Sequence, residues 1–168
     1  MKVGNNKLQK TQKMKRIKFL LAILSVCILP SCLSSGLEEL PVYNDAEITN
    51  FKFEYRWAEK EGKSERLRVK PLNTKVNIDK EKAIVVCQIT VPAADAQAFT
   101  EEVRNKVAQN NIVGFCTIST AATIRPVGSA PHLGKPGDFT QNTMSYEVIA
   151  ADKKTKKTWM LIVESFNK

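Results

Sequence analysis

Residues 47–57 read EITNFKFEYRW, and this stretch decides the fold class. Phe51, Phe53, Tyr55 and Trp57 alternate with polar residues along the segment. A period of two places the apolar side chains on one face of a strand and the polar side chains on the other. The segment therefore predicts an antiparallel strand with one face buried and the other in water.

The same pattern continues through most of the remaining chain. Strands are predicted at 65–72, 76–78, 83–91, 112–120, 144–151 and 158–166, with turns at 58–63, 79–82 and 152–157. In 65–72, Leu67 and Val69 fall on one side, and the run 83–91 is apolar on both faces, which is typical of a central strand. The segment 125–139 is rich in Gly and Pro and is predicted to be a loop.

One segment, 95–108, has a helical period instead. Ala96, Phe99, Val103 and Val107 fall on one stripe, and Asp95 is the predicted cap. The sequence as a whole predicts an all-β, mainly antiparallel domain with one short inserted helix. Two sheets packed face to face as a sandwich are the natural way to bury so many alternating strands.

The amino terminus has the layout of a secretory signal. Seven basic residues and no acidic ones precede or enter an uncharged stretch, FLLAILSVCIL at 19–29. Its 11 residues are too few for a spanning helix, which needs about 20. We therefore expect residues 1–31 to be a signal peptide, and Met14 is an alternative true start because MKRIKFLLAILSVC alone has the same layout.

The end of this signal, LPSC at 29–32, resembles the bacterial lipobox. The resemblance implies that Cys32 is lipidated and becomes the first residue of the mature chain. Cys27 is the competing candidate, but the bulky Val26 precedes it. Residues 32–46 are then a tether, and 47–168 form the domain. An outer-membrane-anchored lipoprotein facing the periplasm or the cell surface is the expected location.

Removal of the signal changes the charge of the chain. The whole sequence carries 26 basic and 17 acidic residues. The signal holds 7 of the basic residues and none of the acidic ones, which leaves 19 against 17, a net charge of +2. The strong positive charge therefore belongs to the signal, and we expect no nucleic-acid partner.

The last third of the chain resembles a known kind of domain. The segments STAATIRPVGSAP at 119–131 and PGDFTQNTMSYEVIAADKKTKKTWMLIVESF at 136–166 are similar to the cadherin-like, immunoglobulin-like β-sandwich domains of bacterial cell-surface lipoproteins. The matching positions are Ser119, Ala122, Ile124, Pro126, Asp138, Phe139, Tyr146, Val148, Ala150, Asp152, Lys156 and Trp159. The resemblance implies an immunoglobulin-like sandwich and a cell-envelope location rather than a reaction.

Three positions of this pattern also have a structural interpretation in the sequence itself. Asp138 and Asp152 are suited to accepting hydrogen bonds from nearby backbone amides in turns, and Phe139 is expected to enter the core. Lys153 stands where the family often has Gly, so this turn is expected to differ in type.

The residues that could carry chemistry are few. Cys87 and Cys116 either form a disulfide or are buried free cysteines. His132 is the single histidine and lies in the Gly/Pro-rich loop, where solvent exposure is expected. No metal site or cofactor is predicted, because the aspartates that could bind calcium are scattered singly at 45, 79, 95, 138 and 152. Catalysis is not expected, and a small hydrolase is the least favoured alternative.

Candidate ligand contacts are limited to two groups of side chains. Trp57 and Trp159 could stack on sugars, but core packing or edge coverage is the favoured interpretation, because both lie in alternating strand patterns. A basic hairpin tip could contact anionic lipid or polysaccharide through Lys153, Lys154, Lys156 and Lys157. The sequence thus favours a lipid-anchored, non-enzymatic binding or assembly module for glycan or another envelope protein. The alternative is a structural or adhesive filament subunit that associates by strand pairing.

Overall fold

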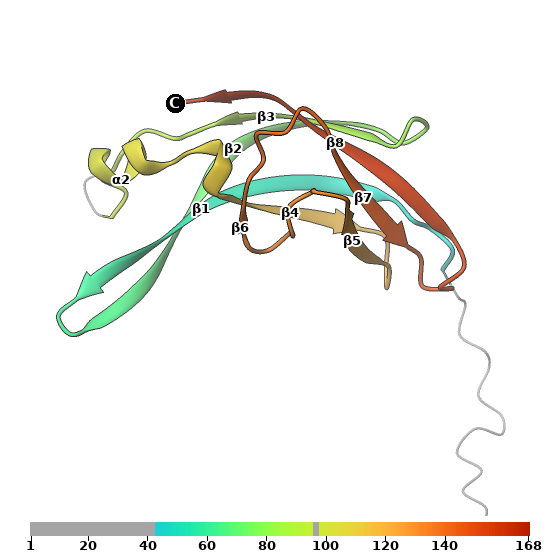
Figure 1. Cartoon of the computed structure of the whole chain (residues 1–168), viewed down its shortest axis with the longest axis horizontal. Helices are drawn as coiled ribbons and strands as arrows, with labels where there is room; N and C mark the ends of the chain where they lie inside the picture. The colour runs from blue at the N-terminus through green and yellow to red at the C-terminus, as the bar shows by residue number, and fades with distance from the viewer. Residues whose placement is uncertain (1–42, 96–97) are drawn as a thin grey trace, which may run out of the picture. The chain divides into compact units, whose positions relative to one another are not determined.

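The computed structural model describes residues 43–95 and 98–168, and eight strands account for most of them (Figure 1). The signal peptide, Cys32 and most of the tether lie outside the described residues. The strands are β1 (Ile48–Glu61), β2 (Ser64–Asp79), β3 (Ile84–Thr90), β4 (Ile112–Ile118), β5 (Thr123–Val127), β6 (Pro136–Gly137), β7 (Met144–Ile149) and β8 (Lys156–Asn167). Two short helices, α2 (Glu101–Lys106) and the 3-10 turn η1 (Gln109–Asn111), connect β3 to β4.

The strands follow the order β5-β7-β8-β3-β2-β1-β4-β6. Every neighbouring pair is antiparallel except β3 and β8, which are parallel. The sheet is therefore mixed, and it curls so that β3 and β8 lie above β1 and β4 in Figure 1. The all-β prediction with antiparallel pairing as the main mode is confirmed, and the predicted central strand 83–91 is β3, between β8 and β2.

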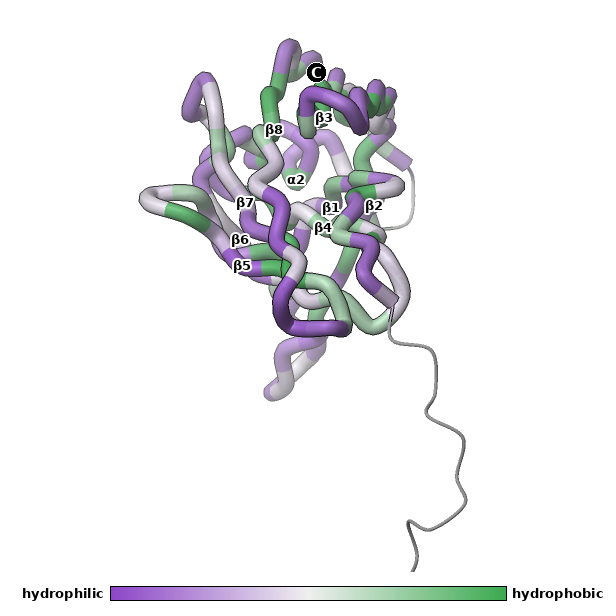
Figure 2. Tube along the Cα trace, turned by 90° about the vertical axis from the view of Figure 1, so that its right-hand side faces the viewer, coloured by the Kyte–Doolittle hydropathy of each residue, from purple (hydrophilic) through white to green (hydrophobic). Residues whose placement is uncertain are grey.

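The alternation in residues 47–57 has the predicted effect. Phe51, Phe53 and Tyr55 are buried, whereas the polar residues between them reach the surface. Hydrophobic and hydrophilic residues alternate along the strands in the same way in Figure 2. The rings of Phe53 and Phe139 meet edge to face, with centroids 5.1 Å apart, in one continuous core. Phe139 is fully buried, which confirms its predicted place.

Gly114 and Tyr146 allow the loop that follows β5 to pack against this core. A Cβ at Gly114 would lie 2.8 Å from the Phe139 ring, so only glycine allows this close approach. The Tyr146 hydroxyl donates a 2.9 Å hydrogen bond to the Pro131 carbonyl, and burial raises the pKa of this hydroxyl. The loop is thereby held against β4 and β7.

Several predicted boundaries were wrong. The turn predicted at 58–63 is mostly strand and is reduced to Gly62 and Lys63, because β1 and β2 stay paired up to Glu61 and Ser64. The predicted strands 65–72 and 76–78 are one strand, β2. The predicted loop 125–139 contains the end of β5 and all of β6, and Pro126 is tolerated because β5 is an edge strand.

The predicted helix 95–108 is also shorter than expected. Only Glu101–Lys106 is α-helical, and its cap is Thr100, whose hydroxyl accepts a hydrogen bond from Val103 N. Asp95 instead accepts hydrogen bonds from the amides of Ala98 and Phe99 in a separate turn. Phe99 and Val107 are buried as the predicted stripe requires, although both lie outside the helix.

The β7–β8 turn contains Lys153, which stands where the domains that this chain resembles often have Gly. The carboxylate of Asp152 accepts hydrogen bonds from the amides of Lys154 and Thr155 and from the Thr155 hydroxyl. These bonds lower the pKa of Asp152 and confirm its predicted role in the turn. Lys153 has a φ of +58°, a left-handed conformation that favours glycine.

We predict that Lys153→Gly stabilises the domain. Relief of the left-handed strain exceeds the added freedom of glycine in the unfolded chain, with a net gain of about 0.5–1 kcal/mol. Urea unfolding measures the change. Lys154→Gly is the matched control and should be neutral or destabilising, since Lys154 is not among the positive-φ residues. Equal effects of both substitutions would contradict the assignment of strain to Lys153.

Candidate binding cleft

The two longest strands, β1 and β2, are paired over only part of their length and separate near the middle. β1 and β2 pair from Glu61↔Ser64 up to Phe53↔Leu72. Beyond that pair, β1 continues beside β4, and β2 continues beside β3 from Asn73 to Asp79. At one end β1 and β2 pair with each other. At the other end β1 pairs with β4 and β2 pairs with β3, so the sheet forks where β1 and β2 separate.

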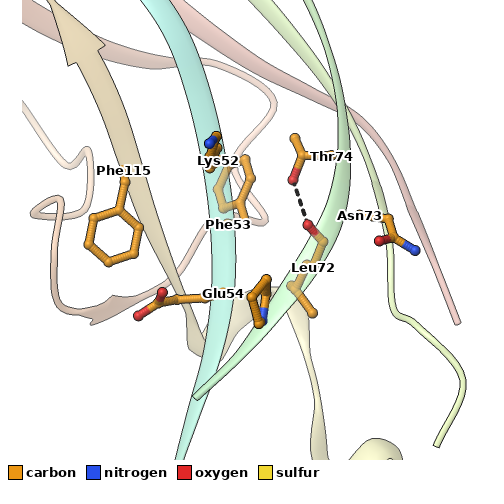
Figure 3. Close-up of a pocket in the computed structure, with 8 residues that line it drawn as sticks. Lys52, Phe53, Glu54, Leu72, Asn73, Thr74 and Phe115 are labelled. Atoms are coloured by element: carbon orange, nitrogen blue, oxygen red, sulfur yellow. Dashed lines mark hydrogen bonds between the residues drawn. The ribbon is translucent and has the colours of Figure 1, made fainter.

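The fork opens a cleft of about 550 Å³ (Figure 3). This volume lies within the range of about 300–1,000 Å³ that is usual for small-molecule sites. Figure 3 shows side chains from β1 and β4 on one side of it and side chains from β2 on the other. The lining residues are Lys52, Phe53, Glu54, Pro71, Leu72, Asn73, Thr74 and Phe115.

Side chains satisfy backbone groups at the fork. Asn50 Oδ1 accepts a 2.8 Å hydrogen bond from the Phe51 amide. The Thr74 hydroxyl donates a 3.2 Å hydrogen bond to the Leu72 carbonyl, on the side of β2 that faces β1 in Figure 3. Backbone groups that lose a neighbouring strand need such partners. Two of the backbone groups beside the fork, the Phe51 amide and the Leu72 carbonyl, thus have side-chain partners.

The β1 side of the cleft carries an ion pair. Glu54 forms a 2.5 Å ion pair with Arg56, and both side chains are partly exposed. Arg56 also donates to the Gly134 carbonyl over 3.1 Å and lies 5.3 Å from the centre of the Phe115 ring. Arg56 thus packs beside the Phe115 ring, which forms one wall of the cleft. It also neutralises the carboxylate of Glu54.

A second, more polar hollow of about 320 Å³ adjoins the cleft, since Asn73 and Thr74 line both. Its residues come from three adjacent strands, with Asn73 opposite Thr90 and Thr90 opposite Asn167. Its lining residues are Asn73, Thr74, Lys75, Gln88, Thr90 and Asn167. The two hollows together join an aromatic wall to a row of amide and hydroxyl groups.

The structure places the two tryptophans differently. Trp57 is half-buried, stacks on Tyr55 with ring centroids 5.8 Å apart, and lies at the same distance from Phe99. Trp159 is fully buried, and its indole nitrogen donates a 2.9 Å hydrogen bond to the Ala46 carbonyl. The favoured core interpretation is therefore confirmed for Trp159, and its candidate role as a sugar contact is wrong, because its ring lies in the core.

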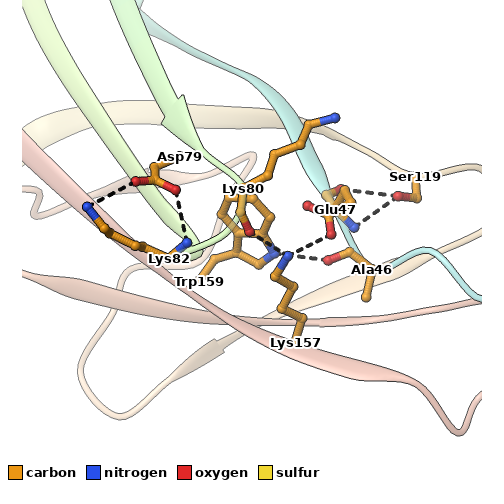
Figure 4. Close-up of polar contacts among 8 residues, drawn as sticks. All are labelled: Ala46, Glu47, Asp79, Lys80, Lys82, Ser119, Lys157 and Trp159. Carbon is orange, nitrogen blue, oxygen red and sulfur yellow. Dashed lines mark hydrogen bonds and ion pairs between the residues drawn. The ribbon is translucent and has the colours of Figure 1, made fainter.

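The four lysines of the predicted basic hairpin tip also differ in exposure. Lys153, Lys154 and Lys156 are exposed. Lys157 instead points inward, where its ammonium contacts Glu47 at 2.6 Å and the Lys80 carbonyl at 2.7 Å (Figure 4). It also lies 4.9 Å from the centre of the Trp159 ring. Lys157 thus fastens the start of the domain to β8.

The remaining candidates stay apart from the cleft. His132 is exposed in the loop, as predicted, and lines a separate hollow of about 130 Å³. Asp138 accepts hydrogen bonds from the amide and hydroxyl of Thr140, which lower its pKa and confirm its predicted role in a turn. Within residues 43–95 and 98–168, no group of three or more His, Cys, Asp or Glu residues is arranged to hold a metal ion.

Cys87 and Cys116 are free thiols on β3 and β4. Burial raises the pKa of Cys87 to about 12 and that of Cys116 to about 11, because an apolar environment disfavours the thiolate. Thiolates are the reactive form, so both cysteines should be inert in the native domain.

We predict that neither thiol reacts readily with a disulfide reagent at neutral pH. Two thiols per domain should become titratable after unfolding in denaturant without reductant. The reaction of the native protein should accelerate as the pH rises toward 11, with Cys116 reacting before Cys87. A native domain that yields no titratable thiol after unfolding would show that the two are bridged.

Sequence reasoning did not identify the cleft. Lys52, Pro71, Asn73 and Phe115 carry no motif. One signal was present: β1 and β2 have 14 and 16 residues, whereas strands usually have about 3–10. Strands of this length can serve two sheets. Pro71, which has no amide hydrogen, also marks a place where a strand lacks a neighbour on one side.

The chain is thus a β-rich domain with a forked sheet and a surface cleft. Residues 48–162 match the family described as DUF5018-related, and the chain belongs to this family. A protein from Bacteroides fragilis NCTC 9343, described as a "putative secreted protein", has a similar crystal structure. The two chains are 36% identical with a TM-score of 0.68, over 76% of this chain and 100% of the other. No curated protein is significantly similar.

Proposed function

We propose that this protein is a lipid-anchored lipoprotein of the cell envelope that binds glycan, without catalysis, in the cleft between β1 and β2. The observation that carries this proposal is the combination of an aromatic wall with amide and hydroxyl groups in one open cleft. Sugars present both apolar ring faces and hydroxyl groups, so they need contacts of both kinds. Phe115 and Pro71 offer the first, and Asn73 and Thr74 offer the second.

Two backbone groups at the fork already have side-chain partners, and this favours a ligand held by side chains over an added strand. Strand addition depends on free main-chain hydrogen-bonding groups at a sheet edge. Here Asn50 and Thr74 already occupy the Phe51 amide and the Leu72 carbonyl. A ligand that binds through side chains does not need these two backbone groups, so their hydrogen bonds do not weaken its binding.

The proposed location depends on the amino terminus. The lipobox-like LPSC supports lipidation at Cys32, eleven positions before Tyr43, the first residue that the structure describes. A similar structure belongs to a protein described as a "putative secreted protein", which supports export. No helix in the described part of the chain is long and apolar enough to cross a membrane. We infer an immunoglobulin-like sandwich from the way β2 joins two sets of strands around one core.

The anchoring claim predicts different effects for two cysteines. Cys32→Ser should release the protein from the membrane fraction and remove the acyl mass from the amino-terminal peptide. Cys27→Ser is the matched control and should leave both unchanged, since Cys27 lies within the predicted signal. Fractionation and mass spectrometry of the amino-terminal peptide measure the outcome. An unacylated, uncleaved amino terminus in the wild type would refute the claim.

The binding claim predicts that the cleft carries the affinity in a glycan-array screen. Phe115→Leu, which keeps bulk but removes the flat ring, and Asn73→Ala should each weaken binding to array hits by roughly five- to tenfold, as expected for a lost contact of about 1–1.5 kcal/mol. Asn77→Ala is the matched control, because Asn77 is exposed on the same face of β2 but does not line either hollow. Absence of any glycan ligand, or equal loss with all three variants, would reject the site.

A second candidate function is a structural subunit that associates by strand pairing. The hairpin tip of β1 and β2 extends beyond the rest of the sheet in Figure 1. Among the described residues, 55–61 pair only with β2, and 64–71 pair only with β1. Leu67 and Val69 are 64% and 45% exposed on this hairpin. In this alternative the hairpin, not the cleft, would mediate association with another chain.

A further inference from the structure

The charges around the cleft indicate which glycans it would accept. Lys52 lines the cleft from β1, and Lys75 lines the adjoining hollow from β2. If the β1–β2 ladder continued past Phe53↔Leu72, Lys52 would face Asn73, and Asn50 would face Lys75. The two lysines therefore lie on the same outer face, on opposite arms of the fork.

Both ammonium groups are available to a ligand. Lys52 and Lys75 are exposed, and neither takes part in an ion pair or side-chain hydrogen bond with another described residue. Lys70, by contrast, is on the same strand as Lys75 but pairs with Asp95 at 2.8 Å. The cleft thus has positive charge on both arms that the domain itself leaves uncompensated.

Two acidic groups lie near the hollows, and the one that lines one of them is neutralised by an arginine. Glu54 is the one carboxylate that lines either hollow, and Arg56 pairs with it at 2.5 Å. Glu164 lies beyond the second hollow, where it accepts a 2.7 Å hydrogen bond from the Gln88 amide. An anionic ligand between Lys52 and Lys75 would meet amide and hydroxyl groups of Asn73 and Thr74 rather than a free carboxylate.

We propose that the cleft selects acidic glycans, whose carboxylate or sulfate groups lie between Lys52 and Lys75 while a sugar ring packs on Phe115. This proposal rests on the proposed function, since it names the class of glycan that the same cleft would take. Exposed ion pairs contribute little each, so selectivity comes from the two lysines acting together. The preference for acidic sugars should accordingly weaken as salt screens the charges.

The test compares acidic oligosaccharides with their neutral derivatives on the full chain in a neutral detergent. Oligogalacturonate, hyaluronan and alginate oligomers are titrated by calorimetry beside the same oligomers with reduced carboxyl groups. At least one acidic member should bind about tenfold more tightly than its reduced form, since each exposed charge contact adds up to about fivefold. The difference should shrink between about 50 mM and about 0.5 M salt.

Three variants locate the effect. Lys52→Met and Lys75→Met should each reduce the acidic preference by about two- to fivefold. Lys60→Met removes the same charge from the outer face of β1, away from both hollows, and should leave the preference unchanged. The reduced oligomers should bind all variants alike, which separates loss of charge from loss of folding.

The possible failures are distinguishable. Equal affinity for acidic and reduced oligomers would overturn the selectivity and leave the glycan-binding proposal standing. An acidic preference that Lys60→Met reduces as much as the cleft variants would overturn the assigned site. Failure of every acidic and reduced oligomer to bind, together with an empty glycan array, would overturn both proposals.

Discussion

The pairing of Phe53 with Leu72 is the constraint on which the rest of this structure depends. It is the last pair between β1 and β2, and past it each strand turns to a different neighbour. Because the two strands are hydrogen-bonded on one side of this point and separate on the other, they connect the two halves of the sheet. The inward side chains of the same pair are buried, so the core fixes the place where the fork begins.

The cleft depends on this fork and on the loop behind it. The Tyr146 hydroxyl holds the loop at Pro131, and Gly114 allows Phe139 to pack closely against β4. The loop in turn gives Arg56 a carbonyl partner at Gly134, and Arg56 lies beside Phe115. A chain of core contacts thus positions an aromatic wall at the surface. In the proposed function, this rigid wall is what a sugar ring would meet.

The sequence predicted those features that depend on local pattern. Alternation placed Phe51, Phe53 and Tyr55 in the core, and turn chemistry predicted the roles of Asp138 and Asp152. The fork could not be predicted in this way, because alternation shows which face of a strand is buried but not which strand lies beside it. The same ambiguity explains Trp159, whose position in a strand pattern is compatible with either core or surface. The lysines at 52 and 75 likewise could not be singled out from the sequence, because only the fork puts one on each arm beside two adjoining hollows.

The most direct test of the central claim is to map a bound oligosaccharide onto the backbone amides by NMR titration. The account predicts that the largest chemical-shift changes fall at residues 52–54, 72–74 and 115, on both sides of the fork. Changes confined to the exposed hairpin at 58–69, or to the β7–β8 turn at 152–157, with the fork residues unaffected, would contradict it.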